Sequence, residues 1–528
     1  MNLATCIKRA LAVWPEREAI VDGQKRFTYK ELGSRIAALT QALSNLGLTK
    51  GSVVACMAPN CVEFLELYFA TALLGVVLAP INYRLSAAEI RPILLHCDAE
   101  LFVSHTDFGA LTAEAVVALP TLKLVTWLGP GVMAKTEDVK GFHYEQFVMR
   151  HWGHELIDNG AGGSDLAQLY YTSGTTGEAK GVMLSHDNVA THALGAVAEF
   201  QFSDGDVWAH IAPMFHLVDA WAIFALTWVG GKHVFLPYFK ADDVLPLLET
   251  EDVTATALVP TMVNQLVKSQ KAWDYSYKKL KAIMTAGSPI APDLVRRVED
   301  IFGCTYIQFY GMTETSPILT ISLPKWEHLQ LPKEKRQEIR AKTGRPFICV
   351  ELRVVRPDGV DVDKDGVEVG EIIARGPTIT AGYWKNRDAT AAAIINGWIH
   401  TGDLAVMDGD GYVNIVDRKK DMIISGGENV YSTEVEYVLQ EHPAVFECAV
   451  FGIPDDRWGE IVKATLVLRP GMTVKPAEMI TFVKERLAHY KAPREIEIVD
   501  EMPKTGSGKI LKKVLRDKHW DSRAKRVN

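Results

Sequence analysis

A run of eleven residues, 171–181, has the composition of a loop that binds phosphate. Its sequence, YTSGTTGEAKG, combines three glycines, four Ser/Thr hydroxyls and one lysine. The backbone N–H groups and hydroxyls of such a loop can surround a polyphosphate, and the lysine adds a positive charge. The run differs from the common Gly-x4-Gly-Lys-Ser/Thr loop, because Gly177 precedes Lys180 by three residues and Gly181 follows it. On composition alone, a flexible turn is the alternative.

Further short motifs follow along the chain: Pro213-Met-Phe-His216, Tyr310-Gly-Met-Thr-Glu314, Thr401-Gly-Asp403, Asp417-Arg418-Lys-Lys-Asp421 and Pro503-Lys-Thr-Gly-Ser-Gly-Lys509. Together with the first run they resemble the motifs of the adenylate-forming superfamily, which includes acyl-CoA synthetases, luciferases and the adenylation domains of peptide synthetases. The motifs occur in the family's order, and the resemblance covers essentially the whole chain. It implies an AMP-forming carboxylic acid:CoA ligase.

The chemistry of such a ligase explains the residue types. A carboxylate cannot readily expel an oxide ion. The acid is therefore first joined to the α-phosphate of ATP, which gives acyl-AMP and pyrophosphate. CoA then displaces AMP and forms the thioester. The protein must neutralise the phosphates, hold Mg²⁺ and bring two anions together. The resemblance therefore implies ATP, Mg²⁺ and coenzyme A as cofactors, and the sequence leaves the direction of the reaction open.

The resemblance also implies roles for single residues in the large N-terminal part. Pyrophosphate would leave from the first run, where the implied ATP ligands are Thr172, Ser173, Gly174, Thr175, Thr176, Gly177 and Lys180, with Thr176 also catalytic. In the second group, Tyr310 would stack on adenine, Gly311 would border adenine and acid, and Thr313 would contact the α-phosphate. Glu314 would bind Mg²⁺, which prefers hard oxygen ligands. Ala286, Gly287 and Ser288 resemble the family's adenine-side loop, and Ala286 would also line the acid pocket. Turns and close packing are the alternatives for these short motifs.

A second set of residues would act from the C-terminal part. By resemblance, Asp403 and Arg418 bind the ribose, and Lys509 bridges the acyl carboxylate and the α-phosphate. Lys420 matches the family's hinge residue. A rotation there would withdraw Lys509 and bring Gly426, Gly427 and Glu428 towards the site as part of a thiol tunnel. Solvated lysines in charged turns are the alternative for Lys420.

The acid pocket is expected around the motif that ends in His216, which would abut the acyl carboxylate and gate thiol entry. Leu217 and Trp221 start an apolar, aromatic helix that would border the pocket, with helix core as the alternative use of its aromatics. An apolar wall favours a hydrophobic acid, medium-chain or cyclic/aryl. Asp219 is displaced from the position of the aspartate that binds a substrate ammonium in amino-acid-activating domains. The other candidate functions are a stand-alone adenylation enzyme with another acceptor, a luciferase-type oxidative enzyme and a non-catalytic nucleotide-binding scaffold.

Bulk properties narrow the class of protein. The chain has 528 residues, a net charge of −8, 48 % hydrophobic and 23 % charged residues, which is the composition of a soluble multidomain protein without support for nucleic-acid binding. Seven cysteines without a CxxC pair indicate reduced, mostly buried thiols and a cytoplasmic location. The longest apolar run, residues 69–81, is short of the ~20 residues of a membrane span. The expected partners are a small carboxylic acid, ATP and CoA, and the family allows a homodimer.

The spacing of apolar residues predicts an α/β fold. Helices are expected over residues 29–48, the first half of 63–78, and from 185, 432 and 477 (to 488). Strands are expected at 53–57, 166–170, 254–259, 282–286, 351–355, 370–374 and 446–451, and residues 326–342 form a charged surface excursion. The expected organisation is a large N-terminal domain with several subdomains, mostly parallel sheets and a β-rich part (1–417), a hinge (418–420) and a small mobile α+β domain (421–528).

Overall fold

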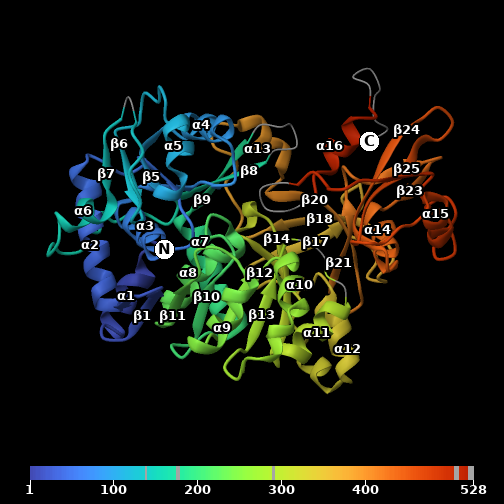
Figure 1. Ribbon diagram of the computed structural model, residues 1–528, viewed down its shortest axis with the longest axis horizontal. Helices are drawn as coiled ribbons and strands as arrows, with labels where there is room; N and C mark the ends of the chain where they lie inside the picture. Colours follow the sequence, from blue (N-terminus) through green and yellow to red (C-terminus); the bar gives the residue numbers. More distant parts are fainter. Residues whose placement is uncertain (137–138, 174–178, 288–289, 291, 505–509, 521–528) are drawn as a thin grey trace. The chain divides into compact units, whose positions relative to one another are not determined.

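The structure is a computed structural model that describes residues 1–136, 139–173, 179–287, 290, 292–504 and 510–520 (Figure 1). The chain divides into two compact units. The first comprises Met1–Leu352, Ala374–His400 and Gly411–Val413, and the second comprises Arg353–Ile373, Thr401–Asp410 and Asn414–Asn528. The second unit thus takes in segments that precede residue 417 as well as the whole C-terminal part.

The first unit contains two mostly parallel sheets. In the described residues, one has seven strands in the order β7 (Gly141–His143), β6 (Leu124–Leu128), β5 (Ala99–His105), β3 (Val53–Met57), β4 (Val77–Pro80), β8 (Leu166–Ser173) and β9 (Ala179–Ser185). The other has nine strands in the order β16 (Arg345–Pro346), β15 (Ile318–Ile321), β14 (Thr305–Gly311), β13 (Ala282–Thr285), β12 (Ala255–Leu258), β10 (Val207–His210), β11 (Lys232–Phe235), β1 (Glu18–Asp22) and β2 (Lys25–Thr28). Among the described residues of these two sheets, antiparallel pairs occur only towards the edges.

Helices cover both faces of both sheets. One core joins the facing sides of the sheets through α1 (Thr5–Val13), α2 (Tyr29–Asn45), α3 (Val62–Leu74), α6 (Tyr144–Met149), α7 (His186–Phe200) and α8 (Leu217–Val229). A second core packs α9 (Ala241–Thr250), α10 (Pro260–Lys268) and α11 (Pro292–Phe302) on the outer face of the nine-stranded sheet (Figure 1). A third packs α4 (Ala87–His96) and α5 (Gly109–Ala115) on the seven-stranded sheet.

The strand sequences explain these layers. In β3, Val54 and Cys56 enter the central core, while Val53, Ala55 and Met57 enter the outer one. Both faces are buried, as expected of parallel strands between helices, and this is why the run is continuously apolar. The helix that follows, α3, is buried along its whole length. The predicted α/β class is therefore confirmed.

A five-stranded sheet accounts for the β-rich part. It runs β17 (Glu351–Val355), β18 (Gly370–Arg375), β20 (Trp398–Met407) and β19 (Ile394–Ile395), with β21 (Val413–Arg418) beside β20. The C-terminal sheet runs β23 (Glu428–Val430), β22 (Ile423–Ser425), β25 (Gly459–Leu468) and β24 (Val445–Asp455), with β26 (Glu495–Ile498) beside β25. Its helices are α14 (Ser432–Glu441), α15 (Pro476–Lys484) and α16 (Lys512–Asp517).

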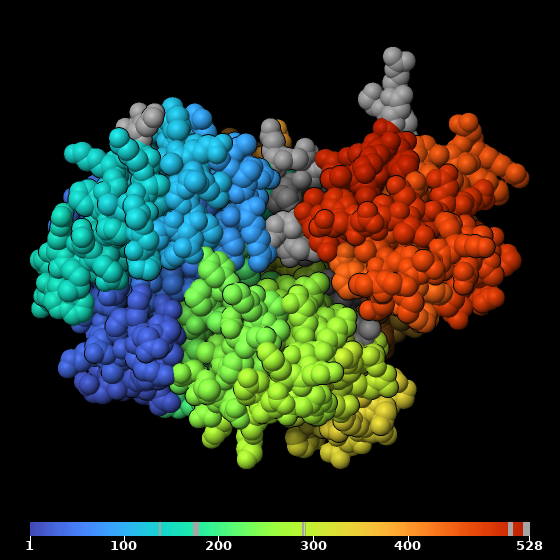
Figure 2. Space-filling view, in the orientation of Figure 1, coloured from blue at the N-terminus to red at the C-terminus, as the bar shows by residue number. Residues whose placement is uncertain are grey.

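Several local predictions are confirmed and two are corrected. The charged segment lies at the surface as η4 (Trp326–Gln330) and α12 (Lys333–Ala341), yellow in Figure 2, and Trp326 is 80 % exposed. The helix expected to reach residue 488 ends at Lys484, since the chain must turn back before Pro493 to reach β26. The strand expected at 166–170 and the helix expected from 185 both form, but an unpredicted strand, β9, lies between the glycine-rich run and α7. No helix in the described part of the chain combines the length and apolar character that a bilayer span needs.

Candidate active site

Three predicted site residues of the first unit follow the carboxyl ends of strands in the nine-stranded sheet. His216 lies after β10, Gly287 after β13, and Glu314 after β14. These three strands lie in one sheet and run parallel to their neighbours β11 and β12. In open α/β sheets, ligands bind in the crevice at this edge. The topology therefore gathers motifs that are about a hundred residues apart in sequence at one edge of one sheet.

The described residues of the glycine-rich run lie at the end of β8 and the start of β9, which pair antiparallel. Thr172 pairs with Lys180 across the two strands, and Ser173 pairs with Ala179. Residues paired directly across antiparallel strands project to the same face, so the hydroxyl of Thr172 and the ammonium group of Lys180 lie on one side of the hairpin. Four of the predicted phosphate ligands, Gly174, Thr175, Thr176 and Gly177, lie outside the described residues, as do Ser288 and Lys509.

Glu314 is the predicted magnesium ligand and lies in η3 (Thr313–Thr315), directly after β14. Its side chain is 6 % exposed. The hydroxyl of Tyr383 donates a hydrogen bond to its Oε1 atom at 2.8 Å. Burial and the neighbouring Glu314 carboxylate raise the pKa of Tyr383, so the phenol keeps the proton that it donates.

A magnesium ion bound with ATP fits this carboxylate. No group of three or more His, Cys, Asp or Glu side chains that could hold a metal occurs among the described residues. Magnesium in nucleotide sites is usually held by one or two carboxylates together with waters and substrate phosphates, because it gives up its water ligands reluctantly. A single buried carboxylate is therefore an arrangement that suits such an ion. An ion held there would neutralise charge on the phosphates of ATP.

Two glycines of the site are required by the backbone. A Cβ atom on Gly311 would lie 1.8 Å from the carbonyl oxygen of Pro317, so no side chain fits at the end of β14. Gly287 has a φ of +95°, which other residues rarely adopt. Beside it, Ala286 is buried.

The N-terminus of α8 carries the residues predicted for the acid pocket. His216 is the N-cap, and its backbone carbonyl accepts a hydrogen bond from the N–H of Asp219 at 3.2 Å. Leu217 is buried, and Trp221 is 1 % exposed, with its indole N–H donating to the carbonyl of Val218 at 3.0 Å. Trp221 lies in an aromatic cluster with ring centroids 5.1–6.3 Å apart, formed with His192, Phe200, Phe202, Trp208 and Phe309.

Asp219 is turned into the core. Its carboxylate accepts from the indole N–H of Trp208 at 3.1 Å and pairs with Nδ1 of His210. The other ring nitrogen of His210 lies 3.0 Å from Nδ1 of His233, and all three side chains are fully buried. Because its oxygens have these partners, Asp219 is poorly suited to bind a substrate ammonium group. The sequence did not reveal this Asp–His–His chain, since its members are spread over a helix and two strands.

In the second unit, Asp403 and Arg418 form an ion pair. Asp403 lies in β20 and Arg418 ends the neighbouring strand β21, and their closest N–O distance is 3.2 Å. The carboxylate is largely buried while the guanidinium is half exposed. A carboxylate acceptor beside a guanidinium donor can bind the two hydroxyls of a ribose.

Next to this pair lies the predicted hinge. Burial lowers the pKa of Lys420. Its carbonyl accepts from the guanidinium of Arg516 at 3.4 Å, and Arg516 also pairs with Asp421 at 3.0 Å. The β22–β23 hairpin turns through Gly426 and Gly427, whose φ values are +63° and +86°. This is the two-glycine turn that a tight hairpin favours, and it presents the exposed Glu428 directly after it.

A strap, residues 377–384, was not singled out from the sequence. Its backbone pairs with β9, since the N–H of Trp384 donates to Gly181 at 2.7 Å and the N–H of Met183 donates to Gly382 at 3.0 Å. It also contacts the turn after β14, since the N–H of Thr380 donates to the carbonyl of Glu314 at 2.8 Å. A Gly-Tyr-Trp sequence has no distinctive periodicity or charge, so only the fold shows that Tyr383 lies at the site.

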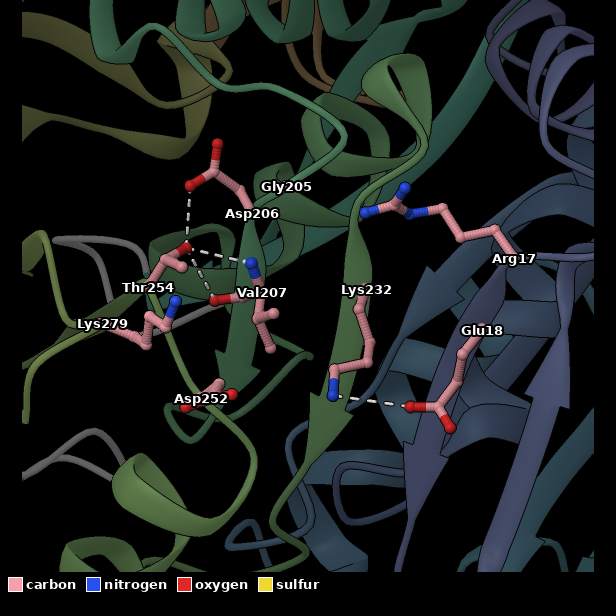
Figure 3. A pocket seen from close by; sticks show the side chains of 9 residues that line it. All are labelled: Arg17, Glu18, Gly205, Asp206, Val207, Lys232, Asp252, Thr254 and Lys279. Atoms are coloured by element: carbon pink, nitrogen blue, oxygen red, sulfur yellow. Dashed lines mark hydrogen bonds and ion pairs between the residues drawn. The ribbon is translucent and has the colours of Figure 1, made fainter.

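A cavity of about 340 Å³ lies elsewhere in the first unit (Figure 3). Its lining comes from the amino ends of β1, β10 and β11, where Glu18, Val207 and Lys232 are the first strand residues. Lys232 lies 3.5 Å from Glu18, and Asp206 accepts from Thr254 at 2.9 Å. This edge is opposite to the one that carries the predicted motifs, so the cavity is not the candidate active site.

Comparison with known proteins gives an independent view of these motifs. The family of AMP-binding enzymes matches residues 7–384, and the C-terminal domain of AMP-binding enzymes matches residues 434–509. Feruloyl-CoA synthase of an Amycolatopsis species is 34 % identical over 517 residues, which covers 96 % of this chain and 99 % of the relative.

Two solved structures are similar over nearly the whole chain. One is an anthranilate CoA ligase in complex with anthranoyl-AMP, with a TM-score of 0.87 and 26 % identity, covering 98 % of this chain and 97 % of the other. The second is ATP-bound MatB from Rhodopseudomonas palustris, with a TM-score of 0.86 and 29 % identity, covering 99 % of each chain.

Proposed function

This chain belongs to the family of AMP-binding enzymes, and we propose that it activates a compact hydrophobic acid, cyclic or aromatic, as its acyl-AMP before transfer to CoA. It is an AMP-forming acid:CoA ligase and uses ATP, Mg²⁺ and CoA. The proposal concerns the acid and the residues that carry each step.

The observation that carries the proposal is the convergence of opposite charges on one side chain. The ammonium group of Lys180 lies 5.2 Å from the ring centroid of Tyr383, and the carboxylate of Glu314 accepts from the hydroxyl of the same tyrosine. The ammonium group that we assign to the phosphates and the carboxylate that we assign to Mg²⁺ thus both contact one tyrosine. Adenylation needs both groups, since the first balances the leaving pyrophosphate and the second holds the ion on the phosphates.

The remaining roles belong to the proposal residue by residue. Thr172 and Ser173, with the loop that follows them, bind the β- and γ-phosphates, while Tyr310 and Thr313 bind adenine and the α-phosphate. Asp403 and Arg418 bind the ribose. Lys509 bridges acid and α-phosphate during adenylation, and a rotation about residues 418–420 then exchanges it for Gly426, Gly427 and Glu428. In this proposal, residues 1–417 and 421–528 act as the two domains on either side of the hinge.

Two features support an aromatic or cyclic acid. The relative in Amycolatopsis is a feruloyl-CoA synthase, and the structural neighbour is an anthranilate CoA ligase with an aryl adenylate. In this chain, Leu217 and the aromatic cluster around Trp221 make the start of α8 apolar and bulky. Such a wall favours a ring over a long chain and disfavours acetate. His216, at the start of the same helix, would abut the carboxylate.

An acid panel tests the proposal. Benzoate, ferulate, cyclohexanecarboxylate, octanoate, acetate and palmitate are each supplied with ATP, Mg²⁺ and CoA, and AMP and acyl-CoA are measured together. We expect equal amounts of AMP and thioester, with the highest kcat/KM for a ring acid. The highest kcat/KM with palmitate or acetate would contradict the assignment of the pocket. AMP without thioester until another acceptor is added would favour the stand-alone adenylation enzyme.

We further propose a cytoplasmic location and a homodimer. All seven cysteines are free thiols, and six of them are buried, which supports a reducing compartment. The dimer rests on the family resemblance. Light scattering coupled to size exclusion measures the mass directly, and a monomer of 58.5 kDa would contradict the dimer.

A further inference from the structure

Tyr383 lies in the strap and contacts two other segments of the first unit. These are the β8–β9 hairpin, through Lys180, and the turn after β14, through Glu314. We propose that Tyr383 is a positioning residue for adenylation, which holds Glu314 for Mg²⁺ and Lys180 for the phosphates of ATP. The inference rests on the proposed function, because it takes Glu314 as the metal ligand and Lys180 as the phosphate ligand. It adds a residue that acts through both of them.

The hydroxyl of Tyr383 fixes the carboxylate. It donates to Oε1 of Glu314 at 2.8 Å, and the turn that carries Glu314 is bound to the same strap through the N–H of Thr380. A carboxylate rotates about its last side-chain bonds unless a donor holds one oxygen. A donor outside the ligand set therefore sets the direction of the metal-binding lone pairs, and losing such a partner typically lowers metal affinity about 10–100-fold.

The ring of Tyr383 contacts Lys180. The ammonium group of Lys180 lies over it at 5.2 Å, within the range of a cation–π contact. The ring takes this position because Tyr383 pairs with Val182 across an antiparallel bridge, two residues after Lys180 in β9. Lysine has a long flexible stem, so an aromatic face restricts where its charge can lie.

The strap itself leaves Tyr383 little freedom. A Cβ atom on Gly382 would lie 2.3 Å from the side chain of Thr390, and the hydroxyl of Thr390 accepts from the backbone N–H of Tyr383 at 2.9 Å. On the other side, Asn188 donates to the carbonyls of Pro377 and Ile379 at 2.7 Å and 2.9 Å. A backbone bound on both sides presents the phenol in one place, which a positioning residue requires.

The test uses Tyr383→Phe, which removes the hydroxyl and keeps the ring. The matched control is Tyr277→Phe, because the hydroxyl of Tyr277 also makes a buried hydrogen bond, to Ala272 at 3.0 Å, in the core on the other face of the sheet. The first readout needs no turnover: the shift of the unfolding midpoint by ATP is measured with Mg²⁺ and with EDTA. The second is the Mg²⁺ concentration that half-saturates acid-dependent exchange of pyrophosphate into ATP.

We expect Tyr383→Phe to raise the half-saturating Mg²⁺ concentration about tenfold or more and to lose most of the metal-dependent shift, with the shift in EDTA unchanged. Tyr277→Phe keeps both values. In a Glu314→Gln background, Tyr383→Phe should add nothing, because its effect passes through that carboxylate. Wild-type metal dependence in Tyr383→Phe, or an additive effect with Glu314→Gln, would overturn the inference. A wild-type enzyme without any metal-dependent shift would instead count against Glu314 as the ligand.

Discussion

At the residue scale, the register of the β8–β9 hairpin decides which side chains lie beside Lys180. Its partner across the hairpin is Thr172, so hydroxyl and ammonium point to the same face. The glycine that follows has tight surroundings, because a Cβ atom on Gly181 would lie 3.1 Å from the ring of Tyr171 and 3.3 Å from Cβ of Trp384. The ammonium group of Lys180 therefore projects from the hairpin next to a backbone position, Gly181, that is tightly packed.

Replacing Lys180 by methionine keeps the stem and removes the charge. We expect acid-dependent ATP–pyrophosphate exchange to fall about 100-fold, the usual cost of losing one preorganised group that balances developing charge. Formation of thioester from supplied acyl-AMP should change only a few-fold, because pyrophosphate takes no part in that step. Lys279→Met, at the cavity on the amino edge of the nine-stranded sheet, is the control and should retain both rates. Equal losses in the two half-reactions would contradict the assignment of Lys180 to the phosphates.

At the scale of elements, two buried histidines of α7 make the stability of the fold depend on pH. His192 is fully buried, stacks on Phe347 with ring centroids 5.2 Å apart, and accepts a long hydrogen bond from the N–H of Ile318 at 3.4 Å. Burial lowers its pKa from 6.5 to about 3. Burial also lowers the pKa of His186, in the first turn of the same helix, to about 4.

The sign of the pH effect follows from these pKa values. Between the folded and unfolded pKa of His192, the unfolded chain binds a proton that the folded chain excludes, so stability falls as the pH drops below about 6.5. We expect His192 alone to lower the free energy of unfolding by about 2 kcal/mol between pH 7 and pH 5. Urea unfolding at the two pH values measures this.

The variant His192→Gln should lose that part of the pH dependence and keep the part due to His186. His154→Gln, at an exposed position, is the control and should leave the pH dependence unchanged. If His192→Gln lost as much stability between pH 7 and pH 5 as the wild type, the buried neutral imidazole would not be the cause.

Elements with strong local signals could be predicted from the sequence, and pairings between distant segments could not. The helix expected over residues 29–48 is α2, because Leu32, Ile36, Leu39 and Leu43 recur at helical spacing and are all buried. The strand that separates the glycine run from α7 was missed, because its pairing with β8 is a tertiary fact. The strap was missed for the same reason. Asp219 was seen, but its partners His210 and Trp208 are nine and eleven residues away on another element.

At the scale of the whole molecule, the predicted site residues fall in both units. Thr172, Lys180 and Glu314 belong to the first, while Asp403 and Arg418 belong to the second. The proposed function assigns both sets to one nucleotide. It also assigns the two reactions to two orientations of the C-terminal part, which a rotation about residues 418–420 would exchange.

Lys509 separates the two reactions in this scheme. Lys509→Ala should abolish adenylation, since the charge that bridges acid and α-phosphate is lost. The same variant should still form thioester from supplied acyl-AMP and CoA, because that step uses the other orientation of the C-terminal part. A folded variant that loses both half-reactions would refute the two-orientation scheme.

In the proposed reaction, this enzyme makes an acyl-adenylate before CoA takes part. Exchange of labelled pyrophosphate into ATP, measured without CoA and with the acid that supports thioester formation, tests it most directly. The account predicts exchange that requires the acid and Mg²⁺ and that proceeds in the complete absence of CoA. Thioester formation from that acid without any exchange in the absence of CoA would contradict it.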